Sequence, residues 1–580
     1  MKLNKIKAIV PAVALLLVGG MSSCMNDLDK GNINPNVQSE PDITALYSKC
    51  YACLILEGMD GTADFTVGDQ GKSTYLRNIF YANELPTDNA ICWWTDGGVE
   101  DYSVNNPKAS SDHIRYLYYR LVYDISYCNH YMELDGAQAD QTKLAEVRFI
   151  RAYLYAQMLD LFGDPPFIPA ISTETPRQAH TYNAKFDASQ SYTRGQLLAL
   201  GREFLFNWVV EELKTAEANL MDAQPRTDTD VNYGRVDKAA AWLMLSRLYL
   251  NAGTYLNNDG QNNPYWTEAL SYAKQVINSG YSLFDDSKIS TQAKANGYKP
   301  YDLLFMGDNG SNGASCEAIF PLLQDGKTTK AWGGSMFYIA AFWDPSMRTV
   351  TGLEAATTAN DWKGMRARPQ LIQKFISDPE QFVGKTAQQI RAMNIDDRAI
   401  FWGVGTEEEP RTLAIADETN GNNKGWLQGI VSPKWNNNYS TGATPHDTYD
   451  VDIDFFLLRA AEAYLNAAEA EMHVNGEASA TAKGWIDDIR NRAHATIKPS
   501  YTLDDVLDER AREFYFEGLR RIDLIRYNRL GGYDVTYGWQ GKGGNYTTET
   551  GAPFDKTRNL YPLPSNEMNA NSNLIQIEGF

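Results

Sequence analysis

Four tryptophans lie in stretches rich in Gly, Asn and Thr, outside any helical periodicity: Trp93, Trp94, Trp332 and Trp362. A flat indole face can stack on the apolar C–H face of a sugar ring, and polar side chains nearby can then orient the ring hydroxyls. The alternative for each residue is an ordinary tryptophan buried beneath a long loop. The loop surroundings therefore make these four side chains candidates for a noncovalent, ring-binding surface.

The common catalytic signatures do not occur in the sequence. Glycoside hydrolysis needs two carboxylates placed across one sugar bond, whereas the adjacent pairs Asp396-Asp397 and Asp487-Asp488 would diverge on a helix. The six His residues show no metal-ligand spacing, and neither a G-x-S-x-G elbow nor a phosphate-binding loop is present. We therefore expect a binding protein and not an enzyme, without a cofactor or a metal site.

The charge balance argues against a nucleic-acid partner. The formal net charge is −20 and the sequence pI is about 4.8, with no Lys/Arg-rich run beyond the N-terminal segment. Binding to nucleic-acid phosphates by counterion release needs clustered cations, which this chain lacks. Aromatic residues make up 12% of the sequence, a share that suits either a stacking surface or a large helical core that uses Tyr freely.

The N-terminus has the pattern of a secretory signal. Lysines within the first seven residues precede an apolar run over residues 8–18, and small residues then lead to Cys24. This run is shorter than the roughly 20 residues that a membrane-spanning helix needs. A Cys after small residues resembles a bacterial lipobox, so we expect a signal peptide over residues 1–23 and a tether over residues 24–42, lipidated at Cys24. The alternative is cleavage elsewhere, with Cys24 incidental.

Most of the remaining chain has helical periodicity. Apolar residues over 145–161 recur at spacings of three and four along two neighbouring stripes, and Gly163 followed by two prolines must end that helix. Alanine-rich helices at 236–252 and 455–474 are each followed by a break and a second helix, a pattern that resembles tetratricopeptide hairpins. We therefore predict a mainly α fold built from such hairpins.

Two regions differ from this pattern. Residues 281–450 are rich in Gly, Asn, Thr and Trp and have few helical segments, which predicts a long irregular insertion domain. Residues 503–530 predict a strong helix broken near Gly518. Its charges of both signs, three and four residues apart, indicate a structural ion network on a partly buried helix.

Several segments, in order, resemble the SusD/RagB family of surface-exposed nutrient-binding lipoproteins of Bacteroidetes outer membranes. The resemblance lies in the lipobox, residues 83–88 (NELPTD), Arg148 and Arg151 with Gly163-Asp164-Pro165, residues 234–240, Lys434-Trp435 and residues 512–521. It covers essentially the whole mature chain. It implies a helical N-terminal part over residues 43–280 with the first binding loops, the insertion over 281–450 with further binding loops, and a helical C-terminal part over 451–580.

Within the family, the chain is most similar to the founding starch-binding member, whose aromatic arc is formed by loop Trp and Tyr residues flanked by polar side chains. Carried over position by position, the resemblance assigns ligand contacts to Trp332 and to Trp362, with Arg368 six residues beyond it. It also assigns Arg77, after the Gly-rich loop, and Asp69 to the rim of the site.

Two positions depart from the family pattern. The first loop tryptophan of the arc falls on Cys92, which leaves Trp93 or Trp94 to substitute for it, and the rim asparagine falls on Gly97. An altered arc is compatible with an α-glucan such as starch or with another glycan such as a fructan. Aromatic stacking recognises the sugar ring but does not distinguish how the rings are linked.

The resemblance also implies a function and a partner. The expected protein is anchored in the cell outer membrane by its N-terminal lipid, captures oligosaccharides without altering them, and passes them to a SusC-like TonB-dependent transporter. The alternative is a peptide- or glycopeptide-binding RagB-like lid. A third possibility is a structural lid whose loop tryptophans are buried and bind nothing.

Overall fold

The computed structural model describes residues 42–56, 70–94, 96–344, 347, 362–406, 409–415, 425–447, 449–532 and 536–580. The chain divides into two units, residues 1–46 and residues 47–580. The expected signal peptide, Cys24 with all but the last residue of the tether, and Asp69 lie outside the described residues. In the part that is described, no helix combines the length and apolar character needed to cross a membrane.

Helices dominate the described chain, as the sequence predicts. The longer ones are α2 (Ile43–Ala52), α3 (Tyr75–Glu84), α5 (Asp112–Glu133), α6 (Gln141–Phe162), α7 (Arg194–Glu217), α8 (Lys238–Leu250), α10 (Trp266–Ile277), α16 (Ala460–Asn475), α17 (Ala480–Arg492) and α18 (Leu503–Phe514). The shorter ones are α4 (Val99–Ser103), α9 (Ala252–Asn257), α11 (Thr291–Ala295), α12 (Pro300–Leu303), α13 (Ser335–Ala340), α14 (Pro369–Gln373), α15 (Ala387–Arg391), α19 (Arg520–Arg526) and α20 (Ser565–Ala570).

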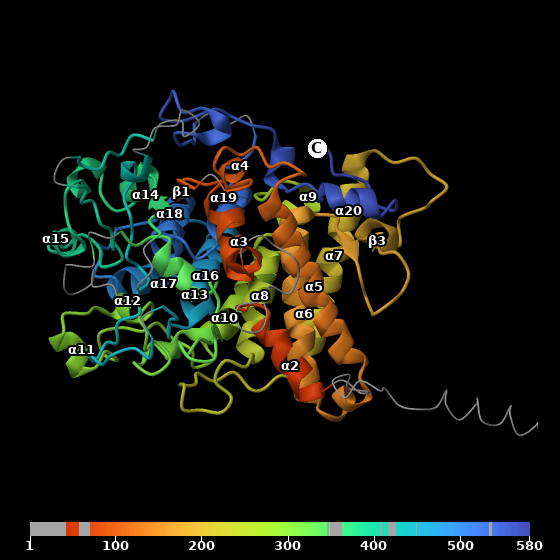
Figure 1. The fold of residues 1–580 in the computed structure, drawn as a ribbon, viewed down its shortest axis with the longest axis horizontal. Helices are drawn as coiled ribbons and strands as arrows, with labels where there is room; N and C mark the ends of the chain where they lie inside the picture. The colour runs from red at the N-terminus through yellow and green to blue at the C-terminus, as the bar shows by residue number, and fades with distance from the viewer. Residues whose placement is uncertain are drawn as a thin grey trace, which may run out of the picture. The chain divides into compact units, whose positions relative to one another are not determined.

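Helix α6 has the two packed sides that its apolar stripes predict, because α5 and α7 both pack against it (Figure 1). Asp140 caps its start by accepting the Lys143 backbone N–H at 3.0 Å. Gly163 ends it at a φ of +71°, where a side chain would be strained. The chain then leaves as strand β2 (Pro166–Phe167), which pairs antiparallel with β3 (Arg177–Gln178).

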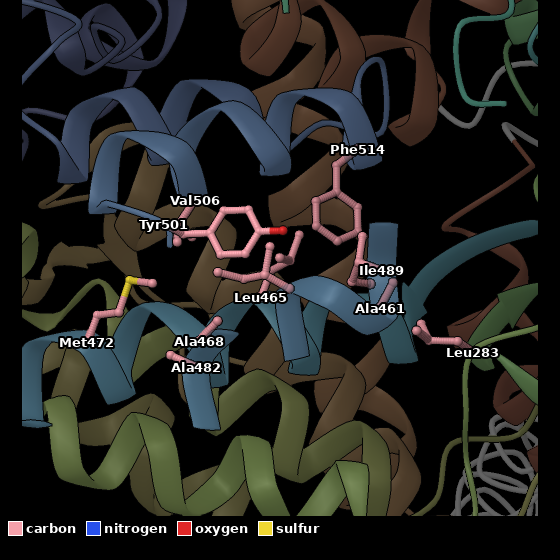
Figure 2. Close-up of a cluster of buried hydrophobic side chains, with 11 residues drawn as sticks. Leu283, Ala461, Leu465, Ala468, Met472, Ala482, Ile489, Tyr501, Val506 and Phe514 are labelled. Atoms are coloured by element: carbon pink, nitrogen blue, oxygen red, sulfur yellow. The ribbon is translucent and has the colours of Figure 1, made fainter. Parts of the chain in front are cut away.

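Helix α16 is the centre of the predicted hairpins. Helix α10 packs against both α8 and α16, while α17 and α18 pack against α16. Figure 2 shows the buried apolar cluster that α16 forms with α17 and α18, to which they contribute Leu465, Ile489 and Phe514 respectively. Small residues such as Ala468 and Ala482 within the cluster allow the helices to approach closely. The alanine-rich sequence thus forms the expected hairpin packing, but the predicted helix over 455–474 begins only at Ala460, because Phe455–Arg459 forms strand β6.

The segment 281–450 is irregular, with only short helices. Strand β4 (Ala318–Leu322) pairs antiparallel with β6 (Phe455–Arg459), with register shifts on both sides of Phe320. Strand β1 (Ala90–Cys92) pairs antiparallel with β5 (Met365–Ala367). Both pairs join this segment to distant parts of the chain, so it folds within the 47–580 unit.

The predicted helix over 503–530 is broken as expected, with α18 ending at Phe514 and α19 starting at Arg520 around Gly518, whose φ is +80°. Its ion network is more buried than the sequence indicated. Glu513 of α18 forms ion pairs with Arg398, Arg459 and Arg492, and none of these side chains is more than 2% exposed. Burial by itself would raise the pKa of Glu513, but the three guanidiniums outweigh it and hold that pKa well below its usual range.

Candidate ligand-binding site

Pairing of β1 with β5 brings two loops together that are far apart in sequence. Cys92 lies opposite Met365 in the ladder, and the Trp93 backbone N–H donates to the Gly364 carbonyl oxygen at 2.8 Å. The Trp362 backbone N–H donates to the Ala340 carbonyl oxygen at the end of α13, at 2.7 Å. Three chain segments therefore fix the backbone that carries the candidate tryptophans.

Three of the four loop tryptophans form one cluster. The Trp332 and Trp362 rings lie nearly parallel, with centroids 6.1 Å apart and an interplanar angle of 15°. The Trp94 ring lies 6.2 Å from Trp362 and is inclined to it by 58°. Trp332 remains 44% exposed, and Trp94 and Trp362 are half-buried. The cluster thus presents indole surface to solvent in two orientations.

Arg77 lies behind this cluster on α3. Its guanidinium carbon lies 5.7 Å from the Trp94 ring centroid and 5.5 Å from that of Phe337, and its Nε donates to the Tyr81 hydroxyl at 2.8 Å. A carboxylate oxygen of Asp96 lies 3.9 Å from Arg77 Nη2. The guanidinium itself is buried. Arg77 is therefore held between rings and a carboxylate behind the cluster, and the role at the rim that the resemblance assigned to it stays a prediction.

Asp96 is a rim residue that the sequence reading missed. Its carboxylate lies 3.9 Å from Lys72 as well as from Arg77, and its side chain is 41% exposed. An exposed carboxylate beside an indole surface can accept hydrogen bonds from sugar hydroxyls. The available signal was its position two residues after Trp94, as the first acidic residue that follows the tryptophan pair.

Trp93 lies apart from the three clustered rings. A Cβ added to Gly425 would lie 1.6 Å from its indole, and the Arg366 guanidinium carbon lies 5.9 Å from its ring centroid. Neighbouring side chains on an extended segment point to opposite sides. Of the two candidates for the missing arc residue, Trp94 is therefore the one that joins Trp332 and Trp362.

Arg368 is placed differently from the expected ligand contact. It is fully buried, and it donates from Nε to the Ala90 carbonyl oxygen at 2.8 Å and from Nη1 to that of Gln540 at 2.6 Å. A third donation, at 3.3 Å, goes to Ser103. These bonds tie β1 to the C-terminal segment, so the structure gives Arg368 the position of a support for the β1 loop.

The arrangement is suited to noncovalent recognition of rings and hydroxyls. Comparison with characterised proteins points the same way. The starch-binding protein SusD of Bacteroides thetaiotaomicron is 33% identical to this chain over 611 aligned positions, which cover 100% of both proteins. The chain belongs to the SusD family. A sequence model of that family matches residues 403–580, and the SusD-like protein P25 of Formosa agariphila is 23% identical over 71% of this chain and 69% of its own length.

Solved structures share the fold of this SusD-family protein. A SusD superfamily protein from Bacteroides thetaiotaomicron superposes with a TM-score of 0.60 at 18% identity, covering 92% of this chain and 99% of its own. Surface glycan-binding protein A from Bacteroides uniformis gives a TM-score of 0.60 at 18% identity, covering 92% and 98%. The predicted SusD-like, mainly helical fold is therefore confirmed.

A fifth loop tryptophan of this SusD-family protein also escaped the sequence reading. Lys363 Nζ lies 4.5 Å from the Trp426 ring centroid, a cation–π contact, and Lys363 has a φ of +43°, rare for a residue with a side chain. Trp426 follows a Gly- and Asn-rich stretch, the same signal that selected the other four.

Within the described residues, no group of three or more His, Cys, Asp or Glu side chains is arranged to hold a metal ion.

Proposed function

We propose that this protein captures oligosaccharides at the surface formed by Trp94, Trp332 and Trp362, without altering them. The observation that carries the proposal is the nearly parallel pair Trp332 and Trp362, with 6.1 Å between centroids and Trp332 44% exposed. Burying such rings would stabilise the free protein, so leaving them exposed is typical of a binding surface. Sugar rings that stack there replace water on the indole faces.

The polar residues at the rim of this surface favour a glycan as the ligand over a purely apolar molecule. Asp96 can accept hydrogen bonds from sugar hydroxyls, and Lys72 can donate to sugar oxygens. Arg77 lies behind Trp94 and positions it. Because Trp94 is inclined by 58° to Trp362, the surface follows a curve, which suits a bent chain such as an α-glucan better than a flat, extended one. The full-length similarity to a protein named for starch binding supports the same choice.

The place and partner of the protein form the rest of the proposal. Residues 1–23 direct export, Cys24 carries the lipid that anchors the chain in the outer membrane facing the medium, and a SusC-like TonB-dependent transporter receives the captured glycan. The lipobox pattern and membership of the SusD family support this reading. Loss of radiolabelled palmitate incorporation in Cys24→Ala would test the anchor.

Isothermal titration of the mature chain without its lipid, residues 25–580, tests the binding. We expect maltoheptaose to bind, with levan, pectic and host-glycan oligomers as the comparison set. The proposal fails if no glycan binds. Binding of short peptides alone would instead favour the RagB-like alternative, and copurification with a transporter without any ligand would favour a structural lid.

A further inference from the structure

A second pocket lies between α7, α9 and the C-terminal segment that includes α20, and it shares no lining residue with the tryptophan cluster. Its volume is about 380 Å³. Apolar walls come from Leu198 of α7, Leu256 of α9, and Leu560 and Ile577 of the C-terminal segment. Figure 1 shows α7, α9 and α20 on one side of the fold. Arg202 of α7 is the one strongly buried cation among the residues that line this pocket.

Arg202 lacks the partners that a buried guanidinium normally has. It is 7% exposed, and its one hydrogen bond to the described residues is a long contact of 3.5 Å from Nη1 to the Asn258 side-chain oxygen. Its Nε has no hydrogen-bond partner, and among the described residues no carboxylate forms an ion pair with it. Burying a cation without a partner is costly, so such groups are usually paired or bind an anion.

Asp160, the carboxylate that most favours the charged form of Arg202, is already paired with another arginine. Asp160 Oδ2 accepts from Arg521 at 2.7 Å, and Asp160 Oδ1 accepts a long contact from the Tyr255 hydroxyl at 3.4 Å. Burial lowers the pKa of Arg202 to about 10, with Asp160 acting in the opposite direction, so the guanidinium stays charged at neutral pH. Asp160 is thus paired with Arg521, and the Arg202 guanidinium is left without an ion-pair partner among the described residues.

The other acidic groups around the pocket form no ion pair with Arg202 within the described residues. Asp164, which follows Gly163 at the end of α6, is hydrogen-bonded through Oδ2 to His180 Nδ1 at 2.6 Å. Asp555 accepts the Thr557 backbone N–H at 2.8 Å. Glu578 is exposed at the pocket edge, where water screens it.

We propose that this pocket binds a small monocarboxylate with an apolar flank, whose carboxylate pairs with Arg202 and whose flank contacts Leu198, Leu256 and Leu560. A single carboxylate matches the one buried guanidinium of the lining that has no ion-pair partner among the described residues. A dianionic phosphate would bring an excess charge close to Asp160 and would find no apolar complement in the walls. Two kinds of molecule offer such a carboxylate: a short peptide, at its C-terminal end, and a sugar acid.

Calorimetric titration of the mature chain with N-acetyl-leucine, D-glucuronate and inorganic phosphate tests the proposal. N-acetyl-leucine, as the mimic of a peptide end, and glucuronate, as the sugar acid, distinguish the two sources. We expect at least one carboxylate to bind with one-to-one stoichiometry and phosphate to bind more weakly. Arg202→Gln should weaken the carboxylate about tenfold or more, because a charge-assisted pair is lost. Arg194→Gln, an exposed change on the same helix, should have no effect.

Two further measurements separate a binding role for Arg202 from a structural one. If Arg202 only supports the fold, Arg202→Gln lowers the melting temperature, whereas removal of an uncompensated buried charge should leave it unchanged or raise it. Ala199→Trp fills the pocket while the Arg202 side chain is retained, and it should also abolish carboxylate binding. Maltoheptaose binding should be unchanged in both variants. Absence of carboxylate binding, unchanged binding in Arg202→Gln, or tighter binding of phosphate would each overturn the proposal.

Discussion

Gly364 lies so close to the indole of Trp94 that a Cβ added to Gly364 would be 2.1 Å from Cε2 of the ring. Contacts below 3.0 Å force one group to move, and a ring on a loop moves more easily than a strand-bound backbone. Gly364 directly precedes β5, and β5 pairs with β1, which ends two residues before Trp94. The orientation of this ring is therefore set by the absence of a side chain at a position in another segment.

Gly364→Ala should reduce glycan affinity while leaving the fold intact. We expect the methyl group to displace Trp94 from Trp362 and to weaken binding roughly tenfold, as loss of a stacked ring would. Isothermal titration measures the affinity, and far-UV circular dichroism measures the fold. Gly484→Ala is the matched control, since nothing lies within 4 Å of its Cβ position; it should leave binding unchanged and stabilise α17 by about 0.5–1 kcal/mol.

Replacing the three clustered tryptophans one at a time should give graded losses of affinity. Trp362→Ala should be the most damaging, because Trp362 contacts both other rings, and a loss of about 1.5 kcal/mol or more is expected. Trp93→Ala should have a smaller effect, since its ring packs on Gly425 instead. The same calorimetric titration checks this order, and a larger loss in Trp93→Ala than in Trp332→Ala would contradict our site assignment.

Glu513→Gln should strongly destabilise the protein. Glu513 pairs with three buried guanidiniums, and removing one member of a buried ion network leaves charges without compensation, at a cost of about 3–5 kcal/mol. Glu203→Gln is the control: its partner Lys185 is 68% exposed, so a loss below about 1 kcal/mol is expected. Urea unfolding of both variants measures the difference, and equal effects would show that burial does not decide the energetics here.

Glu84 makes stability depend on pH. Burial raises the pKa of Glu84 to about 7, although Asn89 and the Gly518 backbone N–H donate to it. The folded state therefore binds a proton more tightly than the unfolded state, whose Glu has a pKa near 4.5. The stabilisation is full below pH 4.5 and is lost as the pH rises to about 7. Glu84→Gln should remove this slope and raise the free energy of unfolding at pH 8, by on the order of 3 kcal/mol.

Asp88, four residues from Glu84, provides the opposite control. Burial alone would raise its pKa, but the Arg520 ion pair, with bonds of 2.7 and 2.8 Å, outweighs burial and holds the pKa well below its usual range. Its contribution to stability is present above the unfolded pKa near 3.8 and is lost as the pH falls. Asp88→Asn should therefore destabilise most at neutral pH. Denaturant titrations between pH 3 and 8 should show that the effect of Asp88→Asn is constant above about pH 4 and shrinks below it, whereas the effect of Glu84→Gln grows between pH 4.5 and about 7.

Local patterns were enough to predict much of the scaffold. The apolar stripes of α6 and the Gly163 stop, the alanine-rich hairpins around α16, and the break at Gly518 all depend on neighbours within a few residues, which determine helix periodicity and backbone freedom. The loop tryptophans could be recognised for the same reason, since Gly and Asn around them exclude regular structure. The resemblance to the SusD/RagB family rested on motifs of this local kind.

Contacts between distant segments decided the site itself. Trp93 and Trp94 are indistinguishable in sequence, and only the β1–β5 pairing, together with Gly364 and Gly425, determines which ring joins the cluster. By its spacing from Trp362, Arg368 matched a ligand contact of the family. In the folded chain it is buried and donates a hydrogen bond to Ala90, 278 residues away in sequence. The sequence by itself determined the helices and the aromatic residues available for binding. Tertiary structure decided which of them face solvent, because exposure depends on what the rest of the chain covers.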